Sequence, residues 1–135
     1  EMEAAGAELK ALEEERTKND NEHKLATAVL GYDFAPDDAY LALYDKCFST
    51  QIQQFTYEVC LFRRAVQKEG NSTLNLGTWG FWSSKGEKRS HTSVMHYVEG
   101  AACWNGPSRT MTVALLCGEE EHVVSVQEPN KCRYE

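Results

Sequence analysis

The sequence predicts a mainly β fold, a flattened antiparallel β-barrel or sandwich, preceded by an N-terminal α-helical segment. Three observations support this fold class. Apolar residues near the start of the chain recur at helical spacing, the pattern changes to a period of two from Gln54 onward, and five cysteines lie in the second part. We therefore expect a coiled-coil-like helical linker over residues 1–31 and a β domain over residues 32–135.

The N-terminal segment carries a short coiled-coil pattern. Its apolar residues are spaced by three and four positions, at Met2, Ala5, Leu9 and Leu12. The pattern then fails, and two heptads are too few to specify a coiled coil. Charged pairs four residues apart, Glu14 with Lys18 and Asp20 with Lys24, favour a solvated helix that ends at Gly31. A disordered charged linker is the alternative.

The remaining elements follow in order along the chain. Asp37 is a good N-cap for a short helix over residues 38–46. Alternating or β-rich runs predict strands at 57–61, 91–98, 111–115 and 122–127, and a Gly- and Trp-rich strand pair at 74–82. Turn-forming residues separate these runs at 69–72, 83–90, 105–108 and 118–121. We expect Trp79 and Trp82 to lie in the core.

The composition argues against two classes of partner. The net charge of -7 disfavours nucleic acid, because phosphate backbones need clustered Lys and Arg. No apolar run approaches the roughly 20 residues that a membrane span needs. The sequence has no signal peptide and opens on a charged pattern, so we expect a secreted protein that has lost its signal or an excised fragment.

The cysteines indicate an oxidising compartment. They lie at Cys47, Cys60, Cys103, Cys117 and Cys132, without a C-x-x-C pair or a histidine at zinc spacing. Disulfides are the favoured reading, and reduced buried thiols are the alternative. The odd count means that one thiol is free or pairs beyond residue 135. The histidines are scattered and the run Glu119–Glu121 lacks spaced calcium ligands, so we expect no metal and no cofactor.

Four polar residues in the β part could together recognise hydroxyl groups: Gln67, Arg109, Glu128 and Tyr134. A carboxylate only accepts hydrogen bonds, a guanidinium only donates, and an amide or a phenol does both. Such a set suits a sugar or polyol better than it suits catalysis, because it has no obvious nucleophile. Each residue also has a structural reading, as a solvated strand residue, an ion-pair partner, a turn residue or a packing residue.

Five stretches carry a resemblance to a known family: 57–62 with Gln67 and Lys68 downstream, 76–82, 103–109, 113–118 and 128–134. Over roughly residues 32–135 the chain resembles the mannose 6-phosphate receptor homology (MRH) family of lectin domains. The resemblance implies that Gln67 and Arg109 engage the axial 2-hydroxyl of mannose, while Glu128 and Tyr134 hold the 3- and 4-hydroxyls. Trp104 is either an aromatic beside the sugar pocket or a core indole.

The resemblance also implies a pairing of the cysteines. It joins Cys47 to Cys60 and Cys103 to Cys132, and it pairs Cys117 with a cysteine that this sequence does not reach, so we expect a free thiol at Cys117. Relatives that bind phosphomannose place phosphate and metal contacts just ahead of the cysteine matching Cys103. This chain has Gly-Ala-Ala at 100–102, which favours unphosphorylated mannose.

The resemblance is closest to a non-catalytic subunit of a glycan-trimming enzyme of the endoplasmic reticulum. We therefore expect a lectin that binds the mannose of N-glycans in the lumen and presents them to a separate catalytic subunit. Three alternatives remain open. They are an MRH lectin of another secretory quality-control protein, a glycosidase that uses Glu128 with a second carboxylate, and an adaptor that acts through the N-terminal helix. The triplet Asn71-Ser72-Thr73 is a glycosylation sequon compatible with the secretory pathway.

Overall fold

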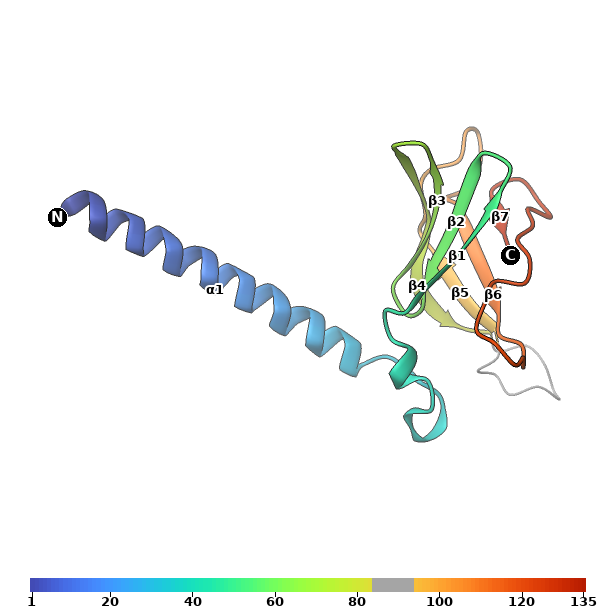
Figure 1. Ribbon diagram of the computed structural model, residues 1–135, viewed down its shortest axis with the longest axis horizontal. Helices are drawn as coiled ribbons and strands as arrows, with labels where there is room; N and C mark the ends of the chain where they lie inside the picture. The colour runs from blue at the N-terminus through green and yellow to red at the C-terminus, as the bar shows by residue number, and fades with distance from the viewer. Residues whose placement is uncertain (84–93) are drawn as a thin grey trace. The chain divides into compact units, whose positions relative to one another are not determined.

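The computed structural model describes residues 1–83 and 94–135, which form two compact units, Glu1–Asp38 and Ala39–Glu135 (Figure 1). The first unit consists mainly of one helix, α1 (Met2–Leu30). No residue of this helix is buried. The backbone N–H groups of Gly31 and Tyr32 donate to carbonyl oxygens of its last turn. The helical interpretation of this segment is therefore confirmed, while the division at residue 31 stays a prediction.

Helix α1 has two exposed ion pairs on its surface. Arg16 pairs with Asp20 and Lys18 with Glu22, at 4.0 and 3.9 Å. These pairs have the predicted spacing of four residues but involve other partners than the predicted Glu14–Lys18 and Asp20–Lys24, because neighbouring charges offer several exposed pairings of similar, small energy. No helix in the described part of the chain is both long and apolar enough to cross a membrane.

The prediction of a short α-helix over residues 38–46 is wrong. The structure has two 3₁₀ turns there, η1 (Pro36–Asp38) and η2 (Leu41–Leu43). The backbone of this segment turns left-handed at three aspartates, with φ of 58°, 52° and 60° at Asp37, Asp38 and Asp45. A right-handed helix cannot run through such residues, and aspartate tolerates this conformation better than most side chains.

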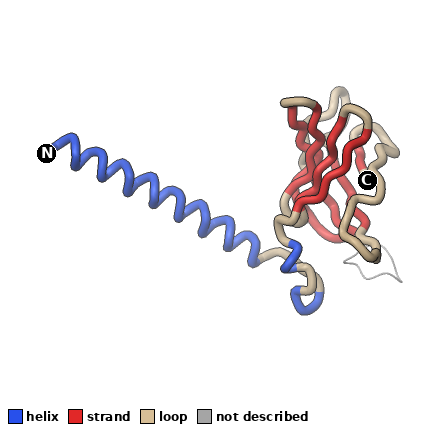
Figure 2. Tube along the Cα trace, in the orientation of Figure 1, coloured by secondary structure: helices blue, strands red, loops and turns tan. Residues whose placement is uncertain are grey.

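The second unit is built on seven strands: β1 (Cys47–Ile52), β2 (Phe55–Cys60), β3 (Arg64–Glu69), β4 (Ser72–Trp82), β5 (Val94–Val98), β6 (Thr110–Ala114) and β7 (Arg133–Tyr134). They form one sheet in sequence order, antiparallel except for the parallel pair β6–β7. The sheet curls into a partly closed barrel, as the tube in Figure 2 shows. The mainly β prediction is confirmed, with one curled sheet instead of two packed ones.

Two strands escaped the sequence prediction. Strand β1 lies at the sheet edge and is mostly exposed, and its sequence Cys-Phe-Ser-Thr-Gln-Ile does not alternate between apolar and polar residues. Strand β3 has two consecutive buried residues, Ala65 and Val66, at a register shift that leaves Leu76 of β4 without a partner. Two consecutive buried residues break the period of two, so the apolar pattern there does not indicate a strand. In contrast, the predicted strand pair at 74–82 is one long strand, β4, with an irregularity between Trp79 and Phe81.

The strand predicted at 122–127 is also wrong, and so is the hairpin that would join it to the preceding strand. These residues have no regular structure. The backbone of Gln127 instead exchanges two hydrogen bonds with that of Glu135, at 2.7 and 2.9 Å. The edge of β6 is taken by β7, which pairs with it through Thr110 and Met111. The predicted loop at 83–90, except Ser83, and residues 91–93 of the next predicted strand lie outside the described residues.

The core of the second unit is an aromatic cluster. The rings of Phe62, Trp79 and Trp82 meet edge to face with centroids 5.2–5.8 Å apart, and Tyr97 packs 6.1 Å from Trp79. Such T-shaped contacts place the positive ring edge on the negative ring face. Trp82 is buried and Trp79 is half-buried, which agrees with the core role expected for them.

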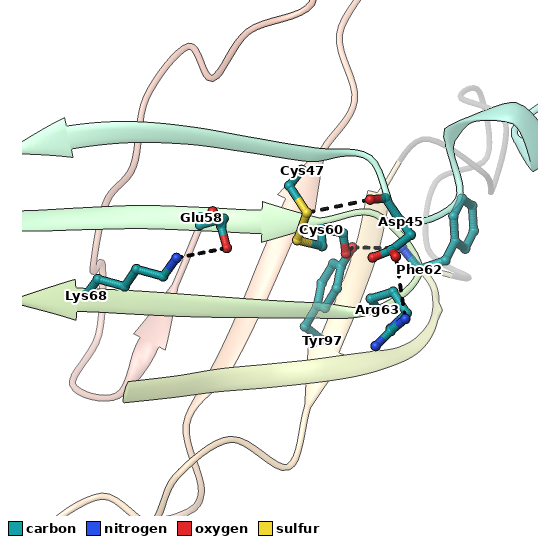
Figure 3. Close-up of a disulfide and its surroundings, with 8 residues drawn as sticks. All are labelled: Asp45, Cys47, Glu58, Cys60, Phe62, Arg63, Lys68 and Tyr97. Atoms are coloured by element: carbon teal, nitrogen blue, oxygen red, sulfur yellow. Dashed lines mark hydrogen bonds and ion pairs between the residues drawn. A yellow bond between two sulfur atoms is a disulfide. The ribbon is translucent and has the colours of Figure 1, made fainter. Parts of the chain in front are cut away.

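Two disulfides staple the second unit, between Cys47 and Cys60 and between Cys103 and Cys132, and Cys117 is free and exposed. The first bridge joins β1 to β2 at directly opposite residues (Figure 3). Beside it, Arg63 forms an ion pair with Asp45 at 3.5 Å. The bridges therefore fix one sheet edge and the segment that leads to β7.

Peptide mapping should recover these pairings from the purified, unreduced protein. We expect linked peptides for Cys47–Cys60 and Cys103–Cys132, and alkylation of Cys117 without prior reduction, since Cys117 is exposed. A protein reduced before alkylation provides the control. A linkage between Cys117 and any of the other four cysteines would contradict the assignment.

Candidate functional site

The register of β2 and β3 separates two sets of polar residues. Tyr57 lies directly opposite Gln67, so both side chains share one face of the sheet. Their neighbours Glu58 and Lys68 project from the other face, where Lys68 Nζ lies 3.2 Å from Glu58 Oε1 (Figure 3). The Tyr57–Gln67 pair therefore stands apart from this ion pair.

Tyr57 connects Gln67 to the C-terminal segment. Its ring centroid lies 6.4 Å from that of Tyr134. Burial raises the pKa of the Tyr57 phenol, and the nearby Tyr134 phenol and Glu128 carboxylate raise it further. The Tyr57 phenol can donate one hydrogen bond and accept others. Three predicted site residues, Gln67, Glu128 and Tyr134, are brought together around Tyr57.

The segment 128–134 is held by its own hydrogen bonds and by β6. Glu128 Oε1 accepts a hydrogen bond from the backbone N–H of Cys132, at 3.0 Å. This bond fixes the carboxylate close to the disulfide and leaves further acceptor positions on its two oxygens. Tyr134 is buried and lies beside Met111 in the parallel β6–β7 pair. The last turn of the chain thus presents a carboxylate and a phenol toward Tyr57.

Arg109 reaches the site from the start of β6. It directly precedes β6 and lies two positions before Met111, the residue that pairs with Tyr134. Its Nη1 donates to the carbonyl oxygens of Ala102 and Ala101, at 2.6 and 3.3 Å. Its Nε is buried and has no hydrogen-bond partner among the described residues. A buried donor of this kind needs a partner, which a bound ligand can supply.

The backbone beside Arg109 is held by a close approach at Gly100. The N–H of Gly100 donates to the Arg109 carbonyl at 2.9 Å, and the N–H of Arg109 donates to the Ala101 carbonyl at 3.0 Å. A Cβ atom at Gly100 would come within 2.6 Å of backbone atoms of Arg109 and Leu76. Glycine is therefore required here, and the stretch 100–102 acts through its backbone as the support of the guanidinium.

The four residues differ in how directly the structure connects them. Gln67 lies opposite Tyr57 in the sheet, and Tyr134 and Glu128 lie near the Tyr57 side chain. Arg109 is related to them through its place in the chain, directly before the strand that pairs with β7. The sequence alone did not indicate Tyr57 as a site residue. Its signal was the strand alternation at 57–61, which says only that Tyr57 faces one side of a sheet.

Trp104 is not a core residue. Its side chain is 81% exposed, so the alternative that placed this indole in the core is wrong. The turn that carries it projects the ring into solvent, where Lys131 Nζ lies 5.0 Å from the ring centroid. The reading of Trp104 as an aromatic beside the sugar remains a prediction.

One cluster in the described part of the chain combines metal-type donors, at Asp45, Cys47 and Cys60. The two sulfur atoms of this cluster are joined in a disulfide. A disulfide sulfur is not a thiolate, and thiolates are the form in which cysteine binds metals. The cluster therefore does not offer the donors of a metal site.

Known proteins match most of this chain. A family model described as glucosidase II beta subunit-like protein matches residues 5–135. The chain belongs to the glucosidase II beta subunit-like family. Within this family, glucosidase 2 subunit beta of Bos taurus is 39% identical over 107 residues, 78% of this chain and 20% of the relative. The Schizosaccharomyces pombe (strain 972) protein is 33% identical over 133 residues, 98% of this chain and 24% of the relative.

The chain thus spans about a fifth to a quarter of these glucosidase II beta subunits. The part it spans is an MRH domain by structural likeness. The crystal structure of the MRH domain of glucosidase II beta bound to mannose matches with a TM-score of 0.57 and 33% identity, covering 70% of this chain and 88% of that one. A solution structure of a point mutant of this domain matches with a TM-score of 0.52 and 31% identity, covering 66% and 82%. The expected MRH fold is confirmed.

Proposed function

We propose that the domain binds a terminal mannose of N-glycans through Gln67, Arg109, Glu128 and Tyr134. The observation that carries this proposal is the convergence of Gln67, Glu128 and Tyr134 on Tyr57. An amide, a carboxylate and a phenol around Tyr57 support a site that binds hydroxyl groups. A structurally similar MRH domain of glucosidase II beta was crystallised with mannose, which supports the choice of ligand.

The roles that the family resemblance implies for the four residues agree with their hydrogen-bonding capacity. The Glu128 carboxylate accepts hydrogen bonds from the 3- and 4-hydroxyls, and the Tyr134 phenol completes this contact as donor or acceptor. Gln67 and Arg109 take the axial 2-hydroxyl, whose oxygen can accept a bond from the Arg109 guanidinium. Because Nη1 is engaged by carbonyl oxygens, the sugar would use the remaining N–H donors of the guanidinium. An epimer with an equatorial 2-hydroxyl would leave these groups unpaired.

The specificity of the domain for monosaccharides can be measured from their dissociation constants. In isothermal titration calorimetry we expect mannose and α-methyl mannoside to bind, and glucose and galactose to bind at least tenfold more weakly, a difference of about 1.4 kcal/mol. Mannose 6-phosphate should give no gain over mannose, since residues 100–102 offer only apolar side chains and use their backbone to hold Arg109.

Tighter binding of mannose 6-phosphate than of mannose would overturn this specificity. A protein that binds none of the four sugars, while retaining the melting transition of the folded domain, would overturn the proposed function itself. Glycan arrays with the same protein would then identify which mannose-bearing arm is preferred.

The chain is, in this proposal, the non-catalytic lectin part of a glucosidase II. It acts in the lumen of the endoplasmic reticulum and presents mannose-bearing N-glycans to the catalytic alpha subunit, which it meets through regions outside residues 1–135. Tethering the glycan raises its effective concentration at the catalytic site without requiring any new contact to the reacting bond.

The alternative of a glycosidase gains no support from the surroundings of Glu128. Acid–base hydrolysis needs a second carboxyl group roughly 5–10 Å away. The groups that interact with Glu128 in the described structure are the N–H of Cys132 and the phenol of Tyr57. Hydrolysis of an aryl mannoside or glucoside by the purified chain alone would favour the enzyme over the lectin.

A further inference from the structure

The tip of the β3–β4 hairpin carries the one Asn-X-Ser/Thr triplet of the sequence, Asn71-Ser72-Thr73. The other five asparagines are followed two positions later by residues other than serine or threonine. The triplet requirement is chemical: a hydroxyl two residues after asparagine is part of what the transferring enzyme recognises. The sugar site described above makes no use of this motif.

The structure displays this triplet openly. Glu69 pairs with Ser72, so Gly70 and Asn71 alone form the turn. Gly70 has φ +56°, a conformation typical of tight hairpin turns, and nothing lies within 4 Å of the position that its Cβ would take. All three residues of the triplet are exposed. A large group on the Asn71 amide would therefore extend into solvent without displacing any part of the sheet.

We propose that Asn71 carries an N-linked glycan, an inference that rests on the proposed location in the secretory pathway. The bond formed joins Asn71 Nδ2 to the anomeric carbon of a lipid diphosphate-linked oligosaccharide. The bond between that carbon and the diphosphate oxygen breaks, the lipid diphosphate leaves, and Nδ2 loses one proton. Ser72 and Thr73 pair with β3 in the folded domain, so the transfer precedes closure of the hairpin.

The glycan lies on the same hairpin as the sugar site but does not belong to it. Gln67 lies within β3 and pairs with Leu74, whereas Asn71 lies in the turn beyond the last pair, Glu69 with Ser72. The two side chains therefore belong to different parts of the hairpin. The modification and the mannose binding are separable, and each can fail without the other.

The test uses the full chain secreted from eukaryotic cells and analysed by intact mass before and after peptide N-glycanase. We expect a glycan mass that the enzyme removes, and a deamidated peptide that contains residue 71. Asn71→Gln and Thr73→Ala should abolish the added mass, whereas Asn105→Gln, which lies outside any triplet, should retain it. Thr73→Ser, which preserves the hydroxyl, should also retain it.

Two outcomes would refute the proposal: a wild-type chain with no glycan mass, or a glycan that persists in Asn71→Gln. In either case mannoside binding by the same preparation distinguishes this failure from failure of the proposed function. We expect Asn71→Gln to bind α-methyl mannoside with the wild-type dissociation constant.

Discussion

Replacement of Arg109 by alanine should lower the affinity for mannosides by about tenfold to a hundredfold. The guanidinium supplies a charged donor, and hydrogen bonds to charged groups are worth roughly 1.5–3 kcal/mol. The free energy of unfolding should fall by only about 1 kcal/mol, because the Ala101 carbonyl still accepts the backbone N–H of residue 109. Calorimetric titration and thermal unfolding of the same preparation measure both quantities.

Two further variants separate recognition from charge. Arg109→Lys keeps the positive charge and one donor for the carbonyl oxygens but removes the Nε group, so binding should fall with little loss of stability. Arg133→Ala removes an equal charge from the exposed residue next to Tyr134 and should bind normally. Glu128→Gln should weaken binding as well, since it keeps the shape but weakens the acceptor. An Arg109→Ala protein that binds mannosides normally and melts far below wild type would make Arg109 a purely structural residue.

Replacement of Tyr97 by alanine should be the most destabilising substitution that we consider, at about 3–5 kcal/mol. The side chain is fully buried, and its hydroxyl donates to the Cys60 carbonyl and accepts from the Phe62 N–H, at 3.2 and 3.3 Å (Figure 3). Tyr97→Phe keeps the ring but leaves both backbone groups without this partner, which should cost roughly 1–3 kcal/mol. Denaturant unfolding of the two variants measures these losses.

The pH dependence of the free energy of unfolding gives a second test of the buried Tyr97 hydroxyl. Burial raises the pKa of this phenol above its ordinary value of 10.0. The unfolded chain therefore loses the proton first, and the associated stability declines as the pH rises above that value. Tyr97→Phe should show less of this alkaline decline. Tyr40→Phe is the matched control, since its half-buried ring packs on Trp82, and equal losses in both variants would contradict the role of the buried hydroxyl.

The sequence predicted strands and turns correctly where the local residue pattern agreed with the tertiary contacts. Strands β2 and β6 show a plain period of two, and the turn at Gly70–Asn71 has the residues that hairpins require. The failures occurred where tertiary contacts overruled local preference. The segment 122–127 is rich in valine, which favours a strand, yet Gln127 pairs with Glu135. At residues 36–46, left-handed aspartates interrupt what composition alone reads as a helix.

The site was accessible to sequence reasoning only in part. Motif spacing drew attention to Arg109, Glu128 and Tyr134, because each lies close to a cysteine or a turn. Tyr57 has no motif of its own, and its place beside Gln67 follows from the exact register of β2 and β3. A shift of one residue would turn its side chain to the other face, and sequence periodicity does not fix register to that precision.

In the proposed site, the disulfide between Cys103 and Cys132 makes sugar recognition dependent on oxidation. Cys132 stands between Glu128 and Tyr134, and its own N–H orients the Glu128 carboxylate. Its partner Cys103 begins the turn that leads to Arg109. A newly made chain in reducing surroundings can form the hairpins of the sheet before these two segments are joined. Maturation of the lectin is therefore tied to thiol oxidation, and reductant should release bound glycan before it unfolds the remaining strands.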